Sequence, residues 1–255
     1  DENKDVQEAI SRGSDALHGA VDGLSQGRFP NPLPLRRAVI DLVDGMKQEP
    51  EAALAGSFTA SRTDVGEGHL MRVTNLALAL GAWIGLPEGE LSNLGVAAML
   101  HDVGYTYREG KVAHGAAGLR VLARQRGFHE SKVRRLLAVY QHHQAYESAV
   151  KPSLYARILH IVDDYDVSTA RRPGQPHPAS PAKVLESMWG ERDKEYDPNL
   201  LAFFIQMMGK FPPGTLLELD DGTWALSGSG GRDRERFEWP MVRIVRGPDG
   251  TPFPG

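Results

Sequence analysis

The sequence contains no cysteine, and this absence excludes several kinds of site. Disulfides, zinc sites built on thiolates and iron–sulfur clusters all require cysteine sulfur. The absence does not by itself identify the cellular compartment, because many proteins of every compartment lack the residue.

Long hydrophobic runs and a large excess of one charge are also absent. The most apolar run, Val73–Leu86, is too short to span a bilayer and carries polar residues. The sequence begins DENKDVQEAI, which lacks the basic and apolar regions of a signal peptide. The formal net charge of −4 gives no overall attraction to nucleic acid or anionic lipid. We therefore expect a cytoplasmic protein with no membrane segment and no DNA or RNA partner, in which local cations or metals bind any phosphate.

Helical periodicity is the dominant pattern, and it predicts a mainly α fold. The helices are expected at residues 15–24, 35–46, 68–86, 91–100, 115–126, 131–140, 153–162, 181–189 and 198–208. The last fifty residues differ: TLLELDDGTWAL alternates around an Asp-Gly turn signal, and PMVRIV follows later. These segments predict a small C-terminal antiparallel hairpin or three-stranded meander. Because the linkers are short, one helical domain with a β appendage is favoured over two independent domains.

Potential metal ligands occur at five places next to apolar helices. They are His69, His101–Asp102, His114, His142–His143 and Asp163. Each of these side chains, taken alone, could be matched by an arginine or a helix N-terminus, but metal ions would satisfy all seven at once. Imidazole and carboxylate together suit a first-row transition metal, and seven ligands suit two ions with a bridging carboxylate, for which Asp102 is the natural candidate. Two such ions can activate a water and stabilise an in-line displacement at phosphorus.

The ordered set of ligands resembles the HD superfamily of phosphohydrolases, specifically its HD-GYP branch. The resemblance extends over residues 35–250, through the segments GHLMRVTNLALALG, AAMLHDVG, HGAAGLRVL, ILHIVDDYDVSTARRP, YDPNLLAFF and FPPGTLLELDDG. It implies an HD-domain helical bundle. We divide the chain into an N-terminal helical segment (1–60), a metal-binding core (61–213) and a β appendage of the same domain (214–255).

The resemblance also implies the site and its chemistry. One metal would be held by His69, His101, Asp102 and Asp163, and the other by Asp102, His114, His142 and His143. Iron or manganese is the expected metal, with zinc, cobalt and nickel as further candidates. The implied reaction is hydrolysis of a bacterial second messenger, cyclic di-GMP or cyclic GMP-AMP. Asp102 and Arg172 would be catalytic, and Arg172, helped by Arg171, would hold the phosphate.

The chain departs from the family pattern at three functional positions. Gln144 and Ala145 follow the histidine pair where the family has Glu and a Gly-Tyr-Pro loop, Tyr105 replaces a lysine that contacts phosphate, and Gln175 replaces a further cation. Losing two charge-assisted contacts weakens binding by roughly two to four orders of magnitude. The segment between His101 and His114 is also shorter than in the family, and Tyr105 is expected either to stack on a guanine or to close this shortened loop. Because Val65 stands where some members have a third-metal Glu, we expect two metals.

These departures leave two alternatives to a cyclic dinucleotide phosphodiesterase. The first is a weak or inactive member that binds a nucleotide, or a sensor or cyclase partner, and signals without turnover. The second is a hydrolase of another phosphoester, such as a nucleotide monophosphate. The oligomeric state does not follow from the sequence.

Overall fold

A computed structural model describes residues 2–28, 31–48, 66–107, 110–170, 179–229 and 237–253. The helices in these ranges are α1 (Glu2–Ser25), α2 (Pro32–Gln48), α4 (Glu67–Trp83), α5 (Glu88–Met99), η1 (Val103–Thr106), α6 (Lys111–Ala123), α7 (Glu130–Gln141), α8 (Leu154–Thr169), α9 (Pro181–Gly190) and α10 (Pro198–Met208). The mainly α fold expected from the sequence is confirmed.

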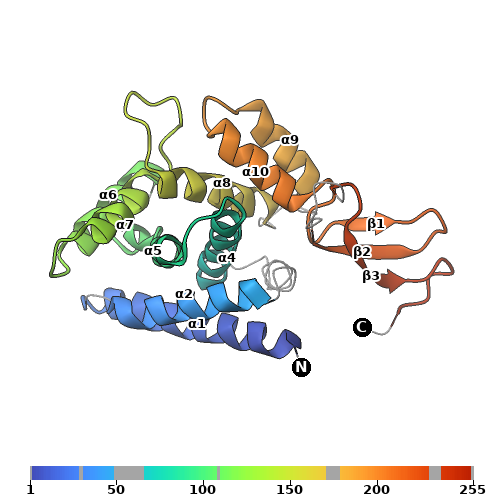
Figure 1. Ribbon diagram of the computed structural model, residues 1–255, viewed down its shortest axis with the longest axis horizontal. Coiled ribbons are helices and arrows are strands. Elements are labelled where there is room, and N and C mark those ends of the chain that lie inside the picture. The colour runs from blue at the N-terminus through green and yellow to red at the C-terminus, as the bar shows by residue number, and fades with distance from the viewer. Residues whose placement is uncertain are drawn as a thin grey trace.

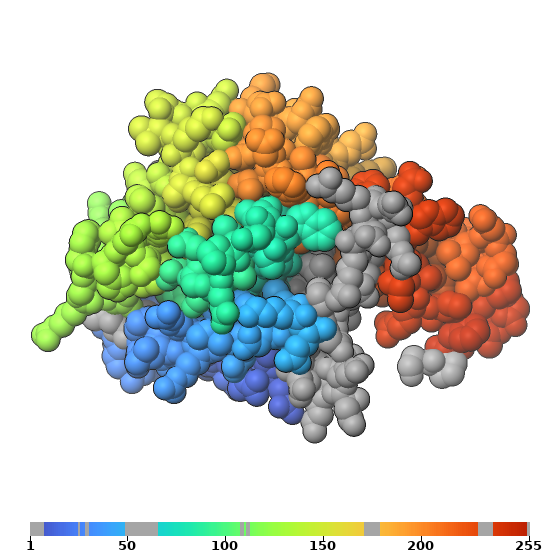
Figure 2. Space-filling view, in the orientation of Figure 1, coloured from blue at the N-terminus to red at the C-terminus, as the bar shows by residue number. Residues whose placement is uncertain are grey.

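The C-terminal strands form the meander that the Asp-Gly turn predicted. They are β1 (Leu216–Glu218), β2 (Trp224–Ser229) and β3 (Met241–Arg246), paired antiparallel in the order β1-β2-β3. The sheet lies at one end of the molecule, and helices α6 and α7 lie at the other (Figure 1). Figure 2 shows the same separation in the space-filling view.

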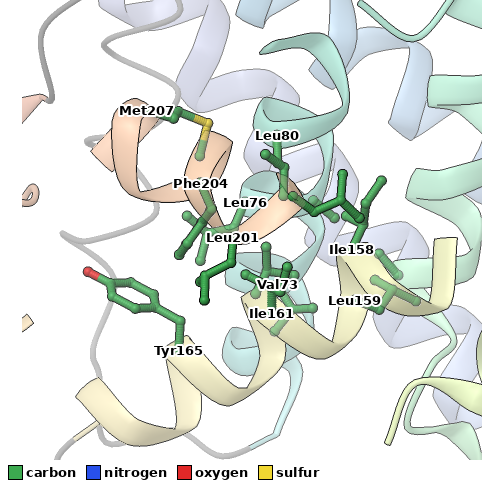
Figure 3. Packing of buried hydrophobic residues seen from close by; sticks show 14 of the residues in the cluster. Val73, Leu76, Leu80, Ile158, Leu159, Ile161, Tyr165, Leu201, Phe204 and Met207 are labelled. Carbon is green, nitrogen blue, oxygen red and sulfur yellow. The ribbon is translucent and has the colours of Figure 1, made fainter. Parts of the chain in front are cut away.

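Helix α4 lies in the middle of the helical part because its sequence, EGHLMRVTNLALALGAW, is apolar on nearly every face. On one side it packs with α1, α2 and α5. On the other side Val73, Leu76 and Leu80 pack against apolar residues of α8 and α10, including Ile158 and Phe204 (Figure 3). This central position places the first turn of α4, which carries His69, among the ends of the neighbouring helices.

Helix α8 continues well past its expected end at residue 162. Asp163 therefore lies within the helix, whereas the sequence pattern placed it beyond the helix end. The added turns are held by tertiary contacts: Tyr165 is fully buried against Phe204, and Asp166 is buried beside α4. This burial is not predicted by the polar sequence DDYDVST, since three aspartates in seven residues usually indicate a solvent-exposed helix end.

Two further features bear on the sequence expectations. Helix α1 begins well before the expected range of 15–24, because the buried positions of that earlier part, Ala9 and Gly13, are small residues that give a weak periodic signal. No helix within the described ranges has both the length and the hydropathy required to cross a bilayer. The division at residues 60 and 213 stays a prediction.

Candidate metal centre

Five helices bring the seven candidate ligands to one place. His69 lies in the first turn of α4, and His101 and Asp102 follow α5 directly. His114 lies in the first turn of α6, the pair His142–His143 follows α7, and Asp163 lies in α8. These positions explain why ligands 94 residues apart along the chain, from His69 to Asp163, can meet.

The first group consists of His69, His101 and Asp163, whose candidate ligand atoms all lie within 4.8 Å of one another. Asp163 Oδ1 is 3.2 Å from His69 Nε2 and 3.8 Å from His101 Nε2. All three side chains are buried, and His101 is completely inaccessible to solvent. One carboxylate and two imidazoles at this separation can surround a single cation.

The second group consists of Asp102, His114, His142 and His143, again with ligand atoms within 4.8 Å of one another. Asp102 Oδ1 is 3.1 Å from His114 Nε2 and 3.5 Å from His142 Nε2, and those two nitrogens are 3.0 Å apart. His143 turns its Nδ1 toward the first group, 3.7 Å from Asp163 Oδ2. The two groups are therefore direct neighbours.

Asp102 contacts both groups. Its Oδ2 lies 3.7 Å from His69 Nε2 and its Oδ1 lies 3.6 Å from His101 Nε2, in addition to the contacts with His114 and His142. The structure thus brings together all seven side chains, divided as the sequence resemblance implies. Asp102 occupies the position between the groups that a bridging carboxylate requires.

Three of the imidazoles are held in one tautomer by backbone carbonyl groups. The Nδ1 atoms contact carbonyl oxygens from His101 to Ala98 at 2.7 Å, from His142 to Val139 at 2.8 Å and from His114 to Gly110 at 2.9 Å. Because a carbonyl oxygen only accepts, each Nδ1–H must donate, and in the neutral imidazole Nε2 then carries a lone pair. All three lone pairs face the cluster, as metal-ligating histidines require.

The electrostatics of the cluster also fit a cation. Burial alone raises the carboxyl pKa of Asp102 and Asp163, but the surrounding histidines outweigh it and hold each pKa far below its ordinary value. Burial lowers the pKa of His142 more than Asp102 raises it, so this imidazole is neutral. Among the described residues, His101 Nε2 and Asp102 Oδ1 are buried without a hydrogen-bond partner. The nearby aspartates outweigh burial and raise the pKa of His69 and His101, so a cation binding there would displace protons from these imidazoles. Carboxylates and imidazoles together form a donor set for a divalent transition metal.

A buried ion pair that the sequence pattern did not predict supports His69. Asp166 Oδ2 lies 2.8 Å from His69 Nδ1, and the carboxylate also accepts hydrogen bonds from Arg72 Nε at 2.8 Å and from its terminal nitrogen at 3.0 Å. Neither Asp166 nor Arg72 is among the candidate site residues named from the sequence. The sequence feature that could have indicated this ion pair is an arginine, Arg72, one helical turn after His69 in an otherwise apolar helix.

Asp166→Asn is expected to weaken metal binding about 10- to 100-fold, because the carboxylate that orients His69 is lost. It is also expected to lower the free energy of unfolding by about 3–5 kcal/mol, since Arg72 loses the carboxylate that neutralises its buried charge. Arg72→Met serves as the control: it disrupts the same ion pair but retains the contact between Asp166 and His69. Metal titration and thermal unfolding of both variants test the assignment, and equal metal affinities for the two variants would refute a specific role for Asp166.

Residues around the cluster have other partners. The ring of Tyr105 stacks on His114 with centroids 3.9 Å apart. This contact fits the expectation that Tyr105 closes the shortened loop between His101 and His114. His160 Nε2 lies 3.1 Å from an oxygen of Asp164, and Asp164 also accepts a hydrogen bond from the Tyr196 hydroxyl. Asp164 lies within 4.8 Å of His143 and Asp163 as well, so it borders the cluster.

The proposed phosphate ligands Arg171 and Arg172 lie outside the described residues, as do Gln175 and Val65. Their roles therefore stay predictions from the sequence. Gln144, which follows the histidine pair, donates its side-chain amide to the carbonyl of Val150.

Comparison with known proteins agrees with the family expected from the sequence. Residues 66–168, which include all seven candidate ligands, match the family model described as HD domain. A protein of Pseudomonas aeruginosa named as a cyclic di-GMP phosphodiesterase is 26% identical over 212 residues, an alignment that covers 71% of this chain and 50% of the relative. The chain thus spans about half the length of the curated relative that it matches.

Proposed function

This chain contains an HD domain, and we propose that it is a metal-dependent phosphodiesterase that hydrolyses a cyclic dinucleotide, with cyclic di-GMP as the first candidate. The observation that carries the proposal is the contact of Asp102 with two adjacent groups of histidine and aspartate ligands. The cyclic di-GMP phosphodiesterase of Pseudomonas aeruginosa supports the choice of substrate.

Two divalent transition metals, iron or manganese, are proposed to bind in the two groups. Such ions supply Lewis acidity toward phosphoryl oxygens and lower the pKa of water, which is the chemistry that phosphodiester hydrolysis needs. The first group would hold one ion through His69, His101 and Asp163. The second would hold the other through three histidines, with Asp102 shared between them.

The protein's own contribution is a rigid, preorganised set of ligands. The carbonyl groups that fix the Nδ1 atoms keep the Nε2 lone pairs directed at one another before any ion binds. Asp166 holds His69 in the same way. Because these supports come from helix backbones and a buried ion pair, little reorganisation is needed on metal binding. Arg172, helped by Arg171, is proposed to hold a non-bridging phosphate oxygen.

Tyr105 supports a second candidate function. It occupies the position where the resemblance places a phosphate-binding lysine, and its ring is stacked on His114. A phenol gives no charge-assisted contact to phosphate, so turnover would be slower than in members that retain the lysine. In this alternative the protein binds a nucleotide, or a sensor or cyclase partner, and signals without hydrolysis.

Substrate tests separate these functions. Protein loaded with iron or manganese is incubated with cyclic di-GMP, cyclic GMP-AMP and p-nitrophenyl phosphate, and the products are separated by chromatography. We expect cleavage of cyclic di-GMP to a linear dinucleotide, abolished by chelation of the metal. Binding of the cyclic dinucleotide without cleavage would favour the signalling alternative, and cleavage of the simple ester alone would favour a different phosphoesterase.

A further inference from the structure

A basic cleft lies away from the metal centre, where α6 ends and α7 begins. It encloses about 430 Å³ and is lined mainly by Arg124, Arg126, His129, Lys132 and Arg135, with Pro32 of α2 at its edge. Its volume falls within the range of small-molecule sites, roughly 300–1,000 Å³. The ends of α6 and α7 that form it point away from the sheet (Figure 1).

The cations of this cleft are not neutralised within the described part of the chain. Lys132 is only 5% exposed, and its Nζ donates to the carbonyl oxygens of Ala123, Gln125 and Gly127, which carry no formal charge. Arg135 donates to the side-chain amide oxygen of Asn93 at 2.6 Å. No ion pair joins Arg124, Arg126, Lys132 or Arg135 to a carboxylate in the ranges that the structure describes. The hydrogen-bonding needs of Lys132 and Arg135 are therefore met, but their charges are not balanced.

The neighbouring Arg134 shows the contrast. It lies on the same helix as Arg135, outside the cleft lining, and pairs with Glu90 at 2.7 Å and Glu130 at 2.6 Å. The carboxylates near this helix therefore neutralise Arg134, which lies outside the cleft lining, and not Arg135, which is part of it. Burial, followed by the charge of Arg36, lowers the pKa of Arg135, as expected where cations gather without an anion.

We propose that this cleft binds the phosphate group of a small anionic ligand, such as a nucleotide monophosphate. Arg124, Arg126 and Arg135 offer planar guanidinium groups that match phosphate oxygens in pairs. Lys132 supplies a fixed charge at the base of the cleft, held by the carbonyl of Ala123 at the end of α6 and by that of Gly127 in the loop that follows. An anion in this position would balance charges that the described protein leaves unbalanced.

The cleft and the metal centre occupy opposite ends of the same helix pair. The backbone at Gly115, near the start of α6, lies against Tyr140, near the end of α7, whereas Lys132 near the start of α7 contacts the end of α6. Ten residues of helix separate His114 from Arg124 along α6, which corresponds to about 15 Å at 1.5 Å per residue. The two sites are therefore distinct, and a substitution in one site makes no direct contact with the residues of the other.

The test is calorimetric titration of metal-loaded wild-type protein, and of Asp102→Ala protein, with inorganic phosphate, pyrophosphate and 5′-GMP at physiological salt. We expect saturable binding of at least one probe to both proteins. Arg135→Gln and Arg124→Gln should each weaken this binding about tenfold or more, and Arg134→Gln should leave it unchanged. Tighter binding of 5′-GMP than of inorganic phosphate would identify an ester as the ligand, and equal binding would identify the free anion; both support the site.

Three outcomes would overturn the proposal. One is the absence of saturable binding at physiological salt to either protein. Another is binding that disappears in Asp102→Ala, which would place the anion at the metals. The third is equal weakening by Arg134→Gln, which would reveal a diffuse charge effect. Circular dichroism verifies that each variant is folded, and the exposed position of Arg124 provides a variant that keeps the fold even where Arg135→Gln does not.

Discussion

Asp102→Ala is expected to reduce the proposed cleavage of cyclic di-GMP by a factor on the order of 1,000 or more. The carboxylate contacts histidines of both ligand groups, so its removal disturbs two candidate metal positions. Loss of Lewis acidity at phosphorus alone is worth several kcal/mol, and each 1.36 kcal/mol is a factor of ten in rate. The measurement is the initial rate of linear dinucleotide formation in the presence of excess manganese.

Asp220→Ala is the matched control, because Asp220 is an exposed aspartate in the turn between β1 and β2. It should retain wild-type activity and stability. A rate for Asp102→Ala within tenfold of the control would show that Asp102 does not organise the reactive site, even if other ligands still bind metal.

Metal removal is expected to lower the unfolding temperature of the wild-type protein by roughly 8–16 °C. A ligand that binds only the folded state at about 1,000 times its dissociation constant adds about 4 kcal/mol, and about 1 kcal/mol shifts the midpoint by about 2–4 °C in a domain of this size. The physical reason is the buried cluster itself. Without a cation, the carboxylates of the cluster are balanced, among the described residues, by protons on neighbouring imidazoles; the pKa of His69, for example, rises to about 11, since three aspartates outweigh its burial.

Calorimetry of chelator-treated protein, before and after readdition of iron or manganese, measures this difference. Readdition should restore the higher midpoint in wild type and in Asp220→Ala, but not in Asp102→Ala. An unfolding temperature that is the same with and without metal would argue that the cluster is stabilised by protons alone.

Most helices could be predicted because their apolar periodicity is strong, as in Leu35–Met46, which lies within α2. The exceptions have a physical cause. Helix α8 continues through DDYDVST because Asp166 meets Arg72 and Tyr165 meets Phe204, and these partners come from α4 and α10. Tertiary contacts of this kind leave no local signal at residues 163–169.

The candidate ligands could be named from the sequence because chemistry limits the choice. With no cysteine, only imidazole and carboxylate side chains beside apolar helices were plausible donors. The supports of these ligands could not be named. The carbonyl groups that fix His101 and His142 belong to residues whose side chains, Ala98 and Val139, carry no functional signal.

The basic cleft illustrates a second limit. Arg124 and Arg135 are separated by a loop and resemble the many other charged residues of amphipathic helices. Arg134 pairs with Glu130 of its own helix and with Glu90 of α5, whereas Arg135 contacts Asn93 of α5 and no carboxylate in the described chain. Charge compensation is a property of the folded surface, so a sequence pattern could not reveal it.

The central claim is that seven side chains converge to hold two metal ions with Asp102 between them. Elemental analysis of protein that has been loaded with manganese and then dialysed tests it most directly, with wild type and Asp102→Ala measured side by side. The account predicts close to two ions per wild-type chain and well under one in the variant. One ion or none in wild type, or two retained in Asp102→Ala, would contradict it.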